Sequence, residues 1–255
     1  MPSWDPGQYL KFADHRLRPA LDLMARIDVE RPRAIHDLGC GPGNITRLLA
    51  ERWPGAKVTG IDSSAEMLAK ARSEVPDIEF QAGDIKDWRP PAPADIIFSN
   101  AALHWLADHE HLLPRLFRQL APGGVLAIQM PRNHDAPSQV AISAAVANGP
   151  WPDELRNVRG ILPVAAPSAY YRILSPVARH LDIWETEYMH VLAGENPVVE
   201  WTKGTALRPY LDALAEPERG EFLANYSARI AAAYPKDPDG CTLLPFRRIF
   251  VLART

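Results

Sequence analysis

Cysteine is scarce in this sequence, and its scarcity excludes two kinds of small protein. Only Cys40 and Cys241 occur among 255 residues, and two widely separated thiols form neither a disulfide framework nor a metal-ligand cluster. We therefore expect both thiols to be reduced and expect no metal site. Reduced thiols are typical of cytoplasmic proteins, so we predict a cytoplasmic location.

An excess of charge of one sign is also lacking. The 28 Lys and Arg residues nearly balance the 31 Asp and Glu residues, and the formal net charge is −3 at pH 7. Proteins that bind nucleic acid usually carry a basic surface. The charge balance therefore disfavours a nucleic-acid partner, although it leaves room for a local basic patch.

Long apolar runs are absent as well. No apolar stretch approaches the roughly 20 residues that cross a bilayer, and Met1–Leu10 lacks the charged-then-apolar pattern of a signal peptide. The 47% of hydrophobic residues is thus available for a core. We expect a monomer without a membrane partner.

Short apolar runs alternate with amphipathic stretches between Ala34 and Met130. This alternation predicts a parallel sheet covered on both faces, and right-handed crossovers make such a sheet doubly wound. The expected strands are 34–38, 57–61, 78–81, 94–99 and 125–130, and the expected helices are 45–52, 65–74 and 109–120. Asn44 is the expected cap of the first helix, and Ser63 or Ser64 that of the second.

The alternation is looser beyond Met130. There we expect helices at 139–147, 197–205 and 218–234 and strands at 182–191 and 247–253. The predicted fold class is α/β, a Rossmann-like, doubly wound, mostly parallel sheet with helices on both faces and a helical cap.

A glycine-rich loop after the first expected strand is the strongest motif. It reads HDLGCGPGN from His36 to Asn44, and its glycines allow a tight turn and the close approach of a ligand. A dinucleotide-binding loop reads G-x-G-x-x-G, whereas Asn44 takes the place of the last glycine here. Asp37, two residues before the first glycine, suits an ammonium group better than a pyrophosphate.

Acidic residues follow the next two expected strands. Asp62 stands about 20 residues after the loop, where an acid accepts ribose hydroxyls in nucleotide-binding folds. Asp84 can accept a hydrogen bond from the adenine amino group, and Met67 can pack on the adenine face. Each acid has a simpler interpretation as a helix cap or a buried polar group. Their succession along the sheet edge favours S-adenosylmethionine, which carries an amino acid, a sulfonium, a ribose and an adenine.

Together these motifs resemble those of the class I S-adenosylmethionine-dependent methyltransferases. The resemblance covers about Ala34 to Met130 and concerns the cofactor, not the methyl acceptor. It implies one methyltransferase domain over 1–255, with a cofactor-binding core at 30–130 and a cap and substrate region at 131–245 interleaved with the last sheet strands. The expected contacts of S-adenosylmethionine and its product S-adenosylhomocysteine are Asp37, Gly39, Gly41, Gly43, Asn44, Asp62, Ser63, Met67, Asp84, Ile85 and Asn100.

A closer resemblance runs along nearly the whole chain. It rests on Trp4-Asp5-Pro6, Gly60–Ser64, Asn100 with Leu103 and Trp105, Gln129-Met130-Pro131, Ala169-Tyr170-Tyr171, Trp201 and Leu207-Arg208-Pro209. These segments are similar to those of the trans-aconitate 2-methyltransferases, which form the monomethyl ester of a tricarboxylic acid. The resemblance implies a carboxyl O-methyltransferase with trans-aconitate as its substrate.

Arginines are the expected partners of such an acid, because a buried carboxylate needs a cationic partner and a guanidinium matches it at two points. Arg247 and Arg248 are consecutive in an expected strand and so point to opposite faces; the resemblance favours Arg248. His104 has two interpretations, a hydrogen bond to the substrate or the end of a strand. The expected substrate contacts are Tyr171, Trp201, Thr205, Arg208, Arg248 and His104.

We expect no catalytic acid or base, because a carboxylate is already ionised at neutral pH. Catalysis then comes from proximity and alignment. Several alternatives stay open: esterification of another small or carrier-linked acid, a non-catalytic S-adenosylmethionine-binding module and, disfavoured by Asn44, a nicotinamide dehydrogenase. The sequence also leaves open which acid and which of its carboxylates is methylated, and whether Trp4–Phe12 is a lid or a docked terminal helix.

Overall fold

The computed structural model describes residues 13–151, 155, 157–158 and 162–255. The lid hypothesis for Trp4–Phe12 therefore lies outside the described residues. Internal contacts divide the chain into two units. The sheet unit comprises 17–132, 164–186 and 248–255, and the helical unit comprises the described residues of 13–16, 133–163 and 187–247.

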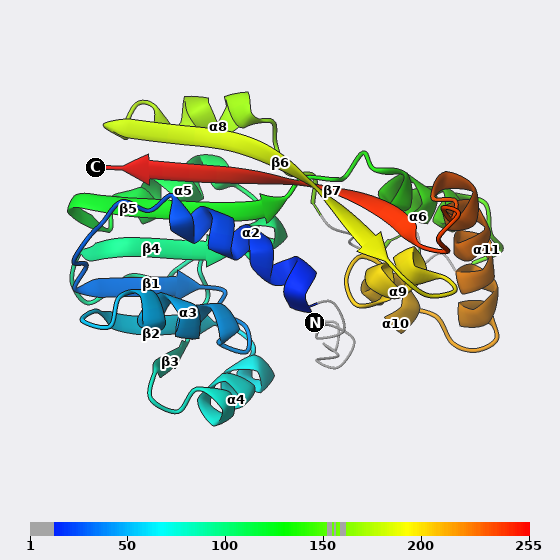
Figure 1. The fold of residues 1–255 in the computed structure, drawn as a ribbon, viewed down its shortest axis with the longest axis horizontal. Coiled ribbons are helices and arrows are strands. Elements are labelled where there is room, and N and C mark those ends of the chain that lie inside the picture. Colours follow the sequence, from blue (N-terminus) through cyan, green and yellow to red (C-terminus); the bar gives the residue numbers. More distant parts are fainter. Residues whose placement is uncertain (1–12, 152–154, 156, 159–161) are drawn as a thin grey trace. The chain divides into compact units, whose positions relative to one another are not determined.

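The sheet has seven strands in the order β3-β2-β1-β4-β5-β7-β6 (Figure 1). The strands are β1 (Ala34–Leu38), β2 (Lys57–Asp62), β3 (Glu79–Ala82), β4 (Ala94–Asn100), β5 (Leu120–Pro131), β6 (His180–Leu192) and β7 (Thr242–Arg254). The first five pair in parallel, and β7 runs antiparallel to β5. The order and the direction of the strands confirm the predicted fold class.

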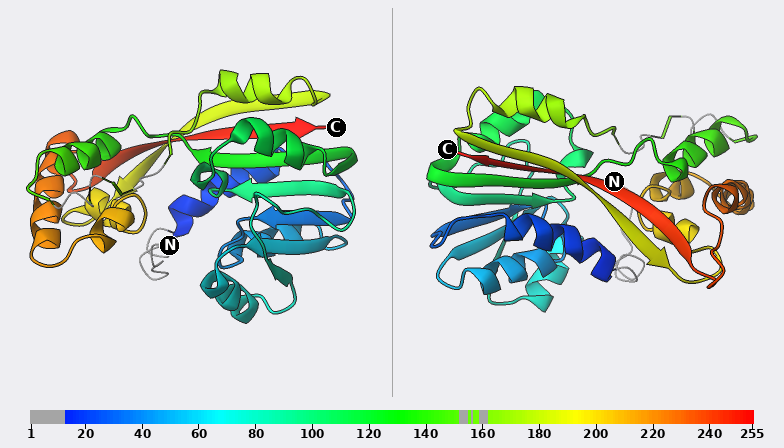
Figure 2. Two further views of the ribbon diagram at one scale, coloured as in Figure 1. Left: turned by 180° about the vertical axis from the view of Figure 1, so that it is seen from behind. Right: turned by 45° about the horizontal axis from the view of Figure 1, so that its top comes forward.

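Helices cover both faces of this sheet. They are α2 (Ala13–Ala25), α3 (Asn44–Arg52), α4 (Ala65–Glu74), α5 (His109–Phe117) and α8 (Pro167–Leu174). Figures 1 and 2 show α2 and α3 on one face and α5 on the other. The central strands β1 and β4 are almost wholly buried, which explains why their sequences are continuous apolar runs rather than alternating ones.

The ends of two helices test the predicted caps. Ser64 is the N-cap of α4, and its hydroxyl accepts a hydrogen bond from the Met67 N–H at 3.3 Å, which confirms that prediction. The prediction for Asn44 was wrong. The helix α3 begins at Asn44 itself, and Gly43 is its N-cap, with a left-handed φ of +83° and no side-chain hydrogen bond. A glycine provides this turn because it has no Cβ to strain the left-handed conformation.

Two strands, β5 and β7, are each six residues longer than the sequence pattern predicts. The residues Pro122-Gly123-Gly124, which precede the expected strand 125–130, are part of β5, where the pairing with β4 is irregular. A Cβ on Gly124 would lie 2.8 Å from the Ala121 carbonyl oxygen, so a glycine permits the irregularity. The strand β7 begins at Thr242 instead of Arg247. Pro245 interrupts its apolar pattern, so the sequence predicts only the second half of the strand. The sequence reading also missed α2, α8 and the short helix α10 (Arg208–Asp212).

The helical unit contains α6 (Pro137–Ala147), α9 (Pro197–Lys203), α10 and α11 (Glu218–Ala233). Its core packs Phe222 and Tyr226 of α11 among apolar side chains of α6 and α9. The buried Tyr226 hydroxyl lies 3.3 Å from the Ser138 carbonyl oxygen and 3.2 Å from Thr202 Oγ1, so its polar atom is satisfied inside the core. Among the described residues, no helix is long and apolar enough to cross a membrane.

The carboxylate of Asp95 fixes the start of β1. Its Oδ2 accepts the backbone N–H groups of Arg33 and Ala34 at 2.7 and 2.9 Å. We predict that Asp95→Ala lowers the free energy of unfolding by about 1–3 kcal/mol, because two backbone donors lose their charged acceptor. Urea denaturation measures this. The matched variant Asp77→Ala, at an exposed position before β3, should be neutral, and equal effects of the two changes would contradict the role of Asp95.

Candidate active site

The glycine-rich loop lies at the carboxyl end of β1, the edge where doubly wound sheets bind ligands. Gly39, Gly41 and Gly43 have positive φ values of +76°, +55° and +83°. The N–H groups of Gly39 and Cys40 both donate to the Ile61 carbonyl oxygen, at 2.8 and 3.0 Å. The loop is therefore fastened to β2 as it turns toward α3.

Two glycines of this loop have different surroundings. A Cβ on Gly39 would lie 2.2 Å from the Ala102 Cβ, so the loop touches the segment that follows β4. A Cβ on Gly41 would meet nothing within 4 Å among the described residues. The backbone at Gly41 thus faces open space, which a ligand can approach.

Asp62 connects the loop to the next helix. Its Oδ2 accepts the Gly41 N–H at 2.9 Å, and its Oδ1 accepts the Ser64 N–H at 2.8 Å. Each carboxylate oxygen keeps a second lone pair for another donor. Asp84 is exposed after β3 and accepts the Lys86 N–H at 2.9 Å. Both acids therefore stabilise local turns and still have acceptor capacity.

Asp37 is buried beneath the loop, with 1% of its surface exposed. Thr46 Oγ1 donates to its Oδ2 at 2.7 Å. Burial raises the pKa of Asp37 to about 7, and the nearby charge of Asp62 adds to the rise, whereas the Thr46 hydrogen bond opposes it. A cation placed beside these two acids would be favoured. Burial, together with the same two acids, also raises the pKa of the Cys40 thiol, which is therefore protonated.

The remaining expected cofactor residues lie around the same edge. Met67 is buried on α4, Ser63 is exposed before it, and Ile85 is buried after β3. The side chain of Ile85 comes within 3.7 Å of a Cβ built on Gly39. Asn100 ends β4, next to the loop contact at Ala102. The sheet unit thus contains every residue expected to contact the cofactor.

The segment after β4 is held in an unusual conformation. Ala101 has a positive φ of +52°, and its N–H donates to the Gln129 carbonyl oxygen at 2.9 Å. The short helix η1 (Leu103–Trp105) follows and buries His104. Burial lowers the pKa of His104 to about 3, and the charge of Arg248 contributes. His104 is therefore neutral at physiological pH and lies near a guanidinium.

The two consecutive arginines of β7 have different environments. Arg248 is only 4% exposed, and its Nη1 donates to Gln129 Oε1 at 3.4 Å. Arg247 belongs to the helical unit, where it lies 3.9 Å from Asp135 and 3.8 Å from Glu187. The sequence analysis named Gln129 only within the resemblance and expected no contact from it, although it stands opposite Asn100 in the β4–β5 register.

Tyr170 and Tyr171 also differ. Tyr170 is fully buried, and its hydroxyl lies 3.0 Å from His109 Nδ1. His109 Nε2 lies 2.9 Å from the Leu103 carbonyl oxygen, so Nε2 donates to that carbonyl. Burial raises the pKa of Tyr170 to about 12. Tyr171, the expected substrate contact, is 60% exposed.

Three expected substrate residues belong to the helical unit. Trp201 is buried there and stacks on His190, with 4.8 Å between ring centroids. Thr205 Oγ1 lies within 3.5 Å of two carbonyl oxygens of the preceding turn. Arg208 begins α10 and forms an ion pair with Asp212 at 2.9 Å.

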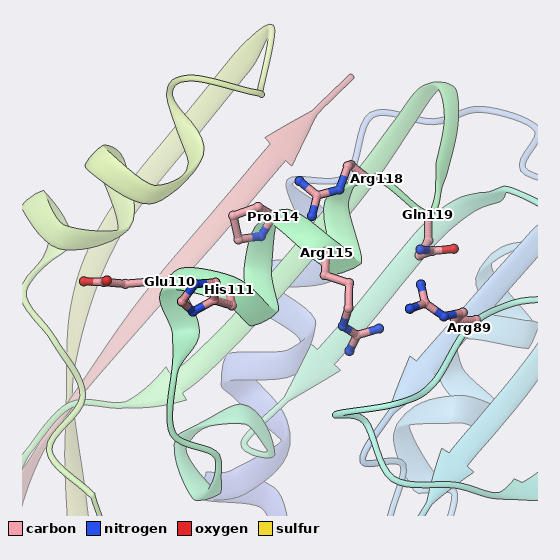
Figure 3. A pocket seen from close by; sticks show the side chains of 7 residues that line it. All are labelled: Arg89, Glu110, His111, Pro114, Arg115, Arg118 and Gln119. Carbon is pink, nitrogen blue, oxygen red and sulfur yellow. The ribbon is translucent and has the colours of Figure 1, made fainter.

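A cavity of about 450 Å³ elsewhere in the sheet unit is lined by arginines (Figure 3). Arg89 and Gln119 line it, and they precede the first residues of β4 and β5, so the cavity belongs to the amino edge of the sheet. Arg115 donates to the carbonyl oxygens of Trp88 and Ile85. Its structural role is thus to fix the turn that begins at Asp84. Within the described residues, no group of three or more potential ligands could hold a metal ion.

Comparison with known proteins agrees with this geometry. A family model described as a methyltransferase domain matches residues 35–124. The trans-aconitate 2-methyltransferase of Azoarcus sp. (strain BH72) is 53% identical over 253 residues, which cover 99% of each chain. The enzyme of the same name from Rhodopseudomonas palustris (strain BisB18) is 49% identical over 256 residues, again with 99% of each chain covered.

A solved structure supports the fold. The YcgJ protein from Bacillus subtilis superposes with a TM-score of 0.62 over 93% of this chain and 98% of its own, at 15% sequence identity. At that identity the likeness concerns the fold alone.

The buried acid beneath the loop generates a prediction about pH. Its folded-state pKa of about 7 lies above the ordinary value of 3.8, so folding favours the protonated form. The stability that this preference contributes is present below about pH 4 and is lost as the pH rises to about 7. We predict that the cofactor-free protein loses about 2–3 kcal/mol of unfolding free energy between pH 5 and pH 8 through this group alone.

Urea denaturation of the wild type and Asp37→Asn at both pH values measures this loss. The variant has no carboxyl group to titrate at position 37, so its stability should fall less over the same interval. Parallel pH dependences of the two proteins would contradict the raised pKa.

Proposed function

The chain belongs to the trans-aconitate 2-methyltransferase family, and on this basis we propose that it transfers a methyl group from S-adenosylmethionine to a carboxylate of trans-aconitate. The products are the monomethyl ester and S-adenosylhomocysteine. The observation that carries the proposal is the full-length identity of about half the residues. The site chemistry is consistent with it: the buried acid Asp37 lies under the glycine loop, and the buried Arg248 lies on β7 of the same sheet.

The loop fits S-adenosylmethionine in shape and charge. Gly41 offers an open backbone surface. The raised pKa of Asp37 beside Asp62 means that negative charge is unfavourable there, and a bound cation would stabilise it. We propose that Asp62 accepts the ribose hydroxyls, that Asp84 faces the adenine, and that Asp37 favours the positively charged end. The other proposed contacts are Gly39, Gly41, Gly43, Asn44, Ser63, Met67, Ile85 and Asn100.

For the acceptor we propose Arg248 and His104 in the sheet unit. Arg248 supplies the positive charge that a buried carboxylate needs, and neutral His104 can donate a hydrogen bond without adding charge. Tyr171, Trp201, Thr205 and Arg208 are proposed as further contacts. We retain the proposal of one catalytic domain in which residues 131–245 supply the cap. A monomer in the cytoplasm, without a nucleic-acid or membrane partner, completes the proposal.

The chemistry requires alignment more than proton transfer. When bound, S-adenosylmethionine supplies a methyl group on a cationic sulfur. A carboxylate oxygen of the acceptor would take up this methyl group and leave neutral sulfur in S-adenosylhomocysteine, so the reaction would release no proton. Arg248 and its neighbours orient the carboxylate and exclude water, and such alignment contributes on the order of 7–11 kcal/mol to catalysis. For this reason we propose no catalytic acid or base.

Methyl transfer to a panel of small acids tests the function. We expect saturable formation of a labelled ester from labelled S-adenosylmethionine and trans-aconitate, and weaker transfer to acids with fewer or differently spaced carboxylates. Alkaline hydrolysis should release the label, because an ester is cleaved and a methylamine is not.

The panel includes a malonyl group linked to a carrier protein. Transfer to that group alone would contradict the proposed substrate and favour a carrier-directed enzyme. Binding of the cofactor without transfer to any acid would contradict the catalytic role.

The carboxylate of Asp62 should determine cofactor affinity. We predict that Asp62→Asn weakens S-adenosylhomocysteine binding about 10- to 100-fold, because a neutral amide replaces a charged acceptor. Calorimetric titration measures the affinity, with Asp77→Asn as the control of the same chemistry. The contradicting outcome is an Asp62→Asn protein that is folded and binds as tightly as the control.

A further inference from the structure

A row of polar side chains crosses three neighbouring strands of the sheet unit. Asn100 pairs with Gln129 between β4 and β5, and Gln129 pairs with Phe250 between β5 and β7. Arg248 pairs with Pro131, two residues further along. Because side chains alternate along a strand, Asn100, Gln129 and Arg248 share one face of the sheet.

Gln129 has an unusual hydrogen-bonding state. Its side chain is fully buried, and its Oε1 accepts a hydrogen bond from Arg248 Nη1 at 3.4 Å. Its Nε2 has no hydrogen-bond partner in the described part of the chain. A buried donor left unsatisfied is costly and rare, so this amide requires an acceptor that the described residues do not supply.

Two neighbours share this property. Asn100 Oδ1 and His104 Nδ1 are likewise buried and without a hydrogen-bond partner among the described residues. The charge of Arg248 is close enough to act on His104. Asn100 stands directly opposite Gln129, and each of these unsatisfied atoms carries its own desolvation cost. Gln129 Nε2 requires an acceptor, whereas Asn100 Oδ1 requires a donor. The group has the composition of a site built around a polar ligand.

We propose that Gln129 is a specificity-determining residue that donates its Nε2–H to the carboxylate of the methyl acceptor while its Oε1 holds the Arg248 guanidinium toward the same anion. The proposal rests on the proposed function, since it identifies the seat of the acceptor in that reaction. It assigns to Gln129 a direct contact and a positioning role at once.

The chemistry of the row selects the class of acceptor. A carboxylate only accepts hydrogen bonds, and Gln129 and Arg248 present donors to it. A protonated amine would meet the positive charge of Arg248 and is excluded by repulsion. An alcohol would reach the donors but carries no negative charge to attract the guanidinium. The row therefore favours O-methylation of an acid over N-methylation.

Gln129 also connects this seat to the cofactor side. Its carbonyl oxygen accepts the Ala101 N–H at 2.9 Å, and the next residue, Ala102, lies against the glycine loop at Gly39. The backbone of Gln129 thus fixes the segment beside the loop while its side chain faces the acceptor. Gln129 can therefore position the acceptor relative to the cofactor.

Two substitutions at this position separate the roles. Gln129→Leu keeps the approximate volume and removes both polar atoms, whereas Gln129→Glu places a second anion beside Arg248. We expect Gln129→Leu to lower kcat/KM for trans-aconitate about 10- to 100-fold, mainly through KM, as for the loss of a hydrogen bond to a charged group. Gln129→Glu should lower kcat/KM at least as much, because its carboxylate would form an ion pair with Arg248 and compete with the substrate.

The readouts distinguish a contact from a structural role. The affinity for S-adenosylhomocysteine should stay within about threefold of the wild-type value, since the Gln129 side chain is not a proposed cofactor contact. Gln119→Leu, at the residue preceding β5 on the amino edge of the sheet, is the control and should leave KM unchanged. A parallel loss of cofactor affinity and thermal stability, with KM unchanged, would overturn the proposal in favour of a purely structural glutamine.

Calorimetric binding of trans-aconitate to the protein loaded with S-adenosylhomocysteine keeps the two claims apart. Wild-type binding that falls at least tenfold in Gln129→Leu supports the seat, even if no ester forms, and the absence of ester then contradicts only the proposed function. Equal affinity of the two proteins overturns the seat. A wild type that binds no acid overturns it as well.

Discussion

One backbone hydrogen bond, from the Ala101 N–H to the Gln129 carbonyl oxygen, joins the two halves of the site. It holds Ala101 in a left-handed conformation that few residues other than glycine adopt. That conformation turns the chain so that Ala102 reaches the glycine loop at Gly39. The strain of order 1–3 kcal/mol that such a residue stores is offset by the pairing of β4 and β5 on either side. This bond therefore adds to the strand pairing of β1, β4 and β5 that fixes the two halves relative to each other.

The electrostatic arrangement follows from the same edge of the sheet. Asp37 and Asp62 lie on the side of β1 and β2, whereas Arg248 lies on the side of β5 and β7. A cationic methyl donor and an anionic acceptor therefore each find charge of the opposite sign. The transfer neutralises the sulfonium and the reacting carboxylate, so a water-excluding site with fixed charges suits it without any proton relay.

The sequence predicts the part of the fold that depends on local pattern. Continuous apolar runs identify β1, β2 and β4 to within one residue at their ends, and the Ser64 cap follows from residue chemistry. The N-terminus of α3 could not be predicted from residue chemistry in the same way. The left-handed conformation of Gly43 starts this helix without a side-chain cap. The extent of β5 depends on tertiary pairing that allows Gly124 inside a strand. The sequence pattern alone does not indicate a strand at this glycine.

The site divides in the same way. The glycine loop and its acids can be found in the sequence because ligand binding imposes a local motif. Gln129 cannot, since a polar residue in an apolar strand has no local signal that separates a ligand from a packed side chain. The alternation of a strand shows that Arg247 and Arg248 face opposite ways, yet only the structure shows that Arg248 is the buried one. Contacts between strands that are distant in sequence determine this half of the site.

A crystal structure with S-adenosylhomocysteine and trans-aconitate bound together tests the central claim most directly. The account predicts one carboxylate within hydrogen-bonding distance of Gln129 Nε2 and the Arg248 guanidinium, with an oxygen pointing at the cofactor sulfur. The gap between that oxygen and the sulfur should leave room for the methyl group, so that the donor complex brings the reacting atoms to about 3–3.5 Å. An acid bound away from this row, with its carboxylates facing other residues, would contradict the account.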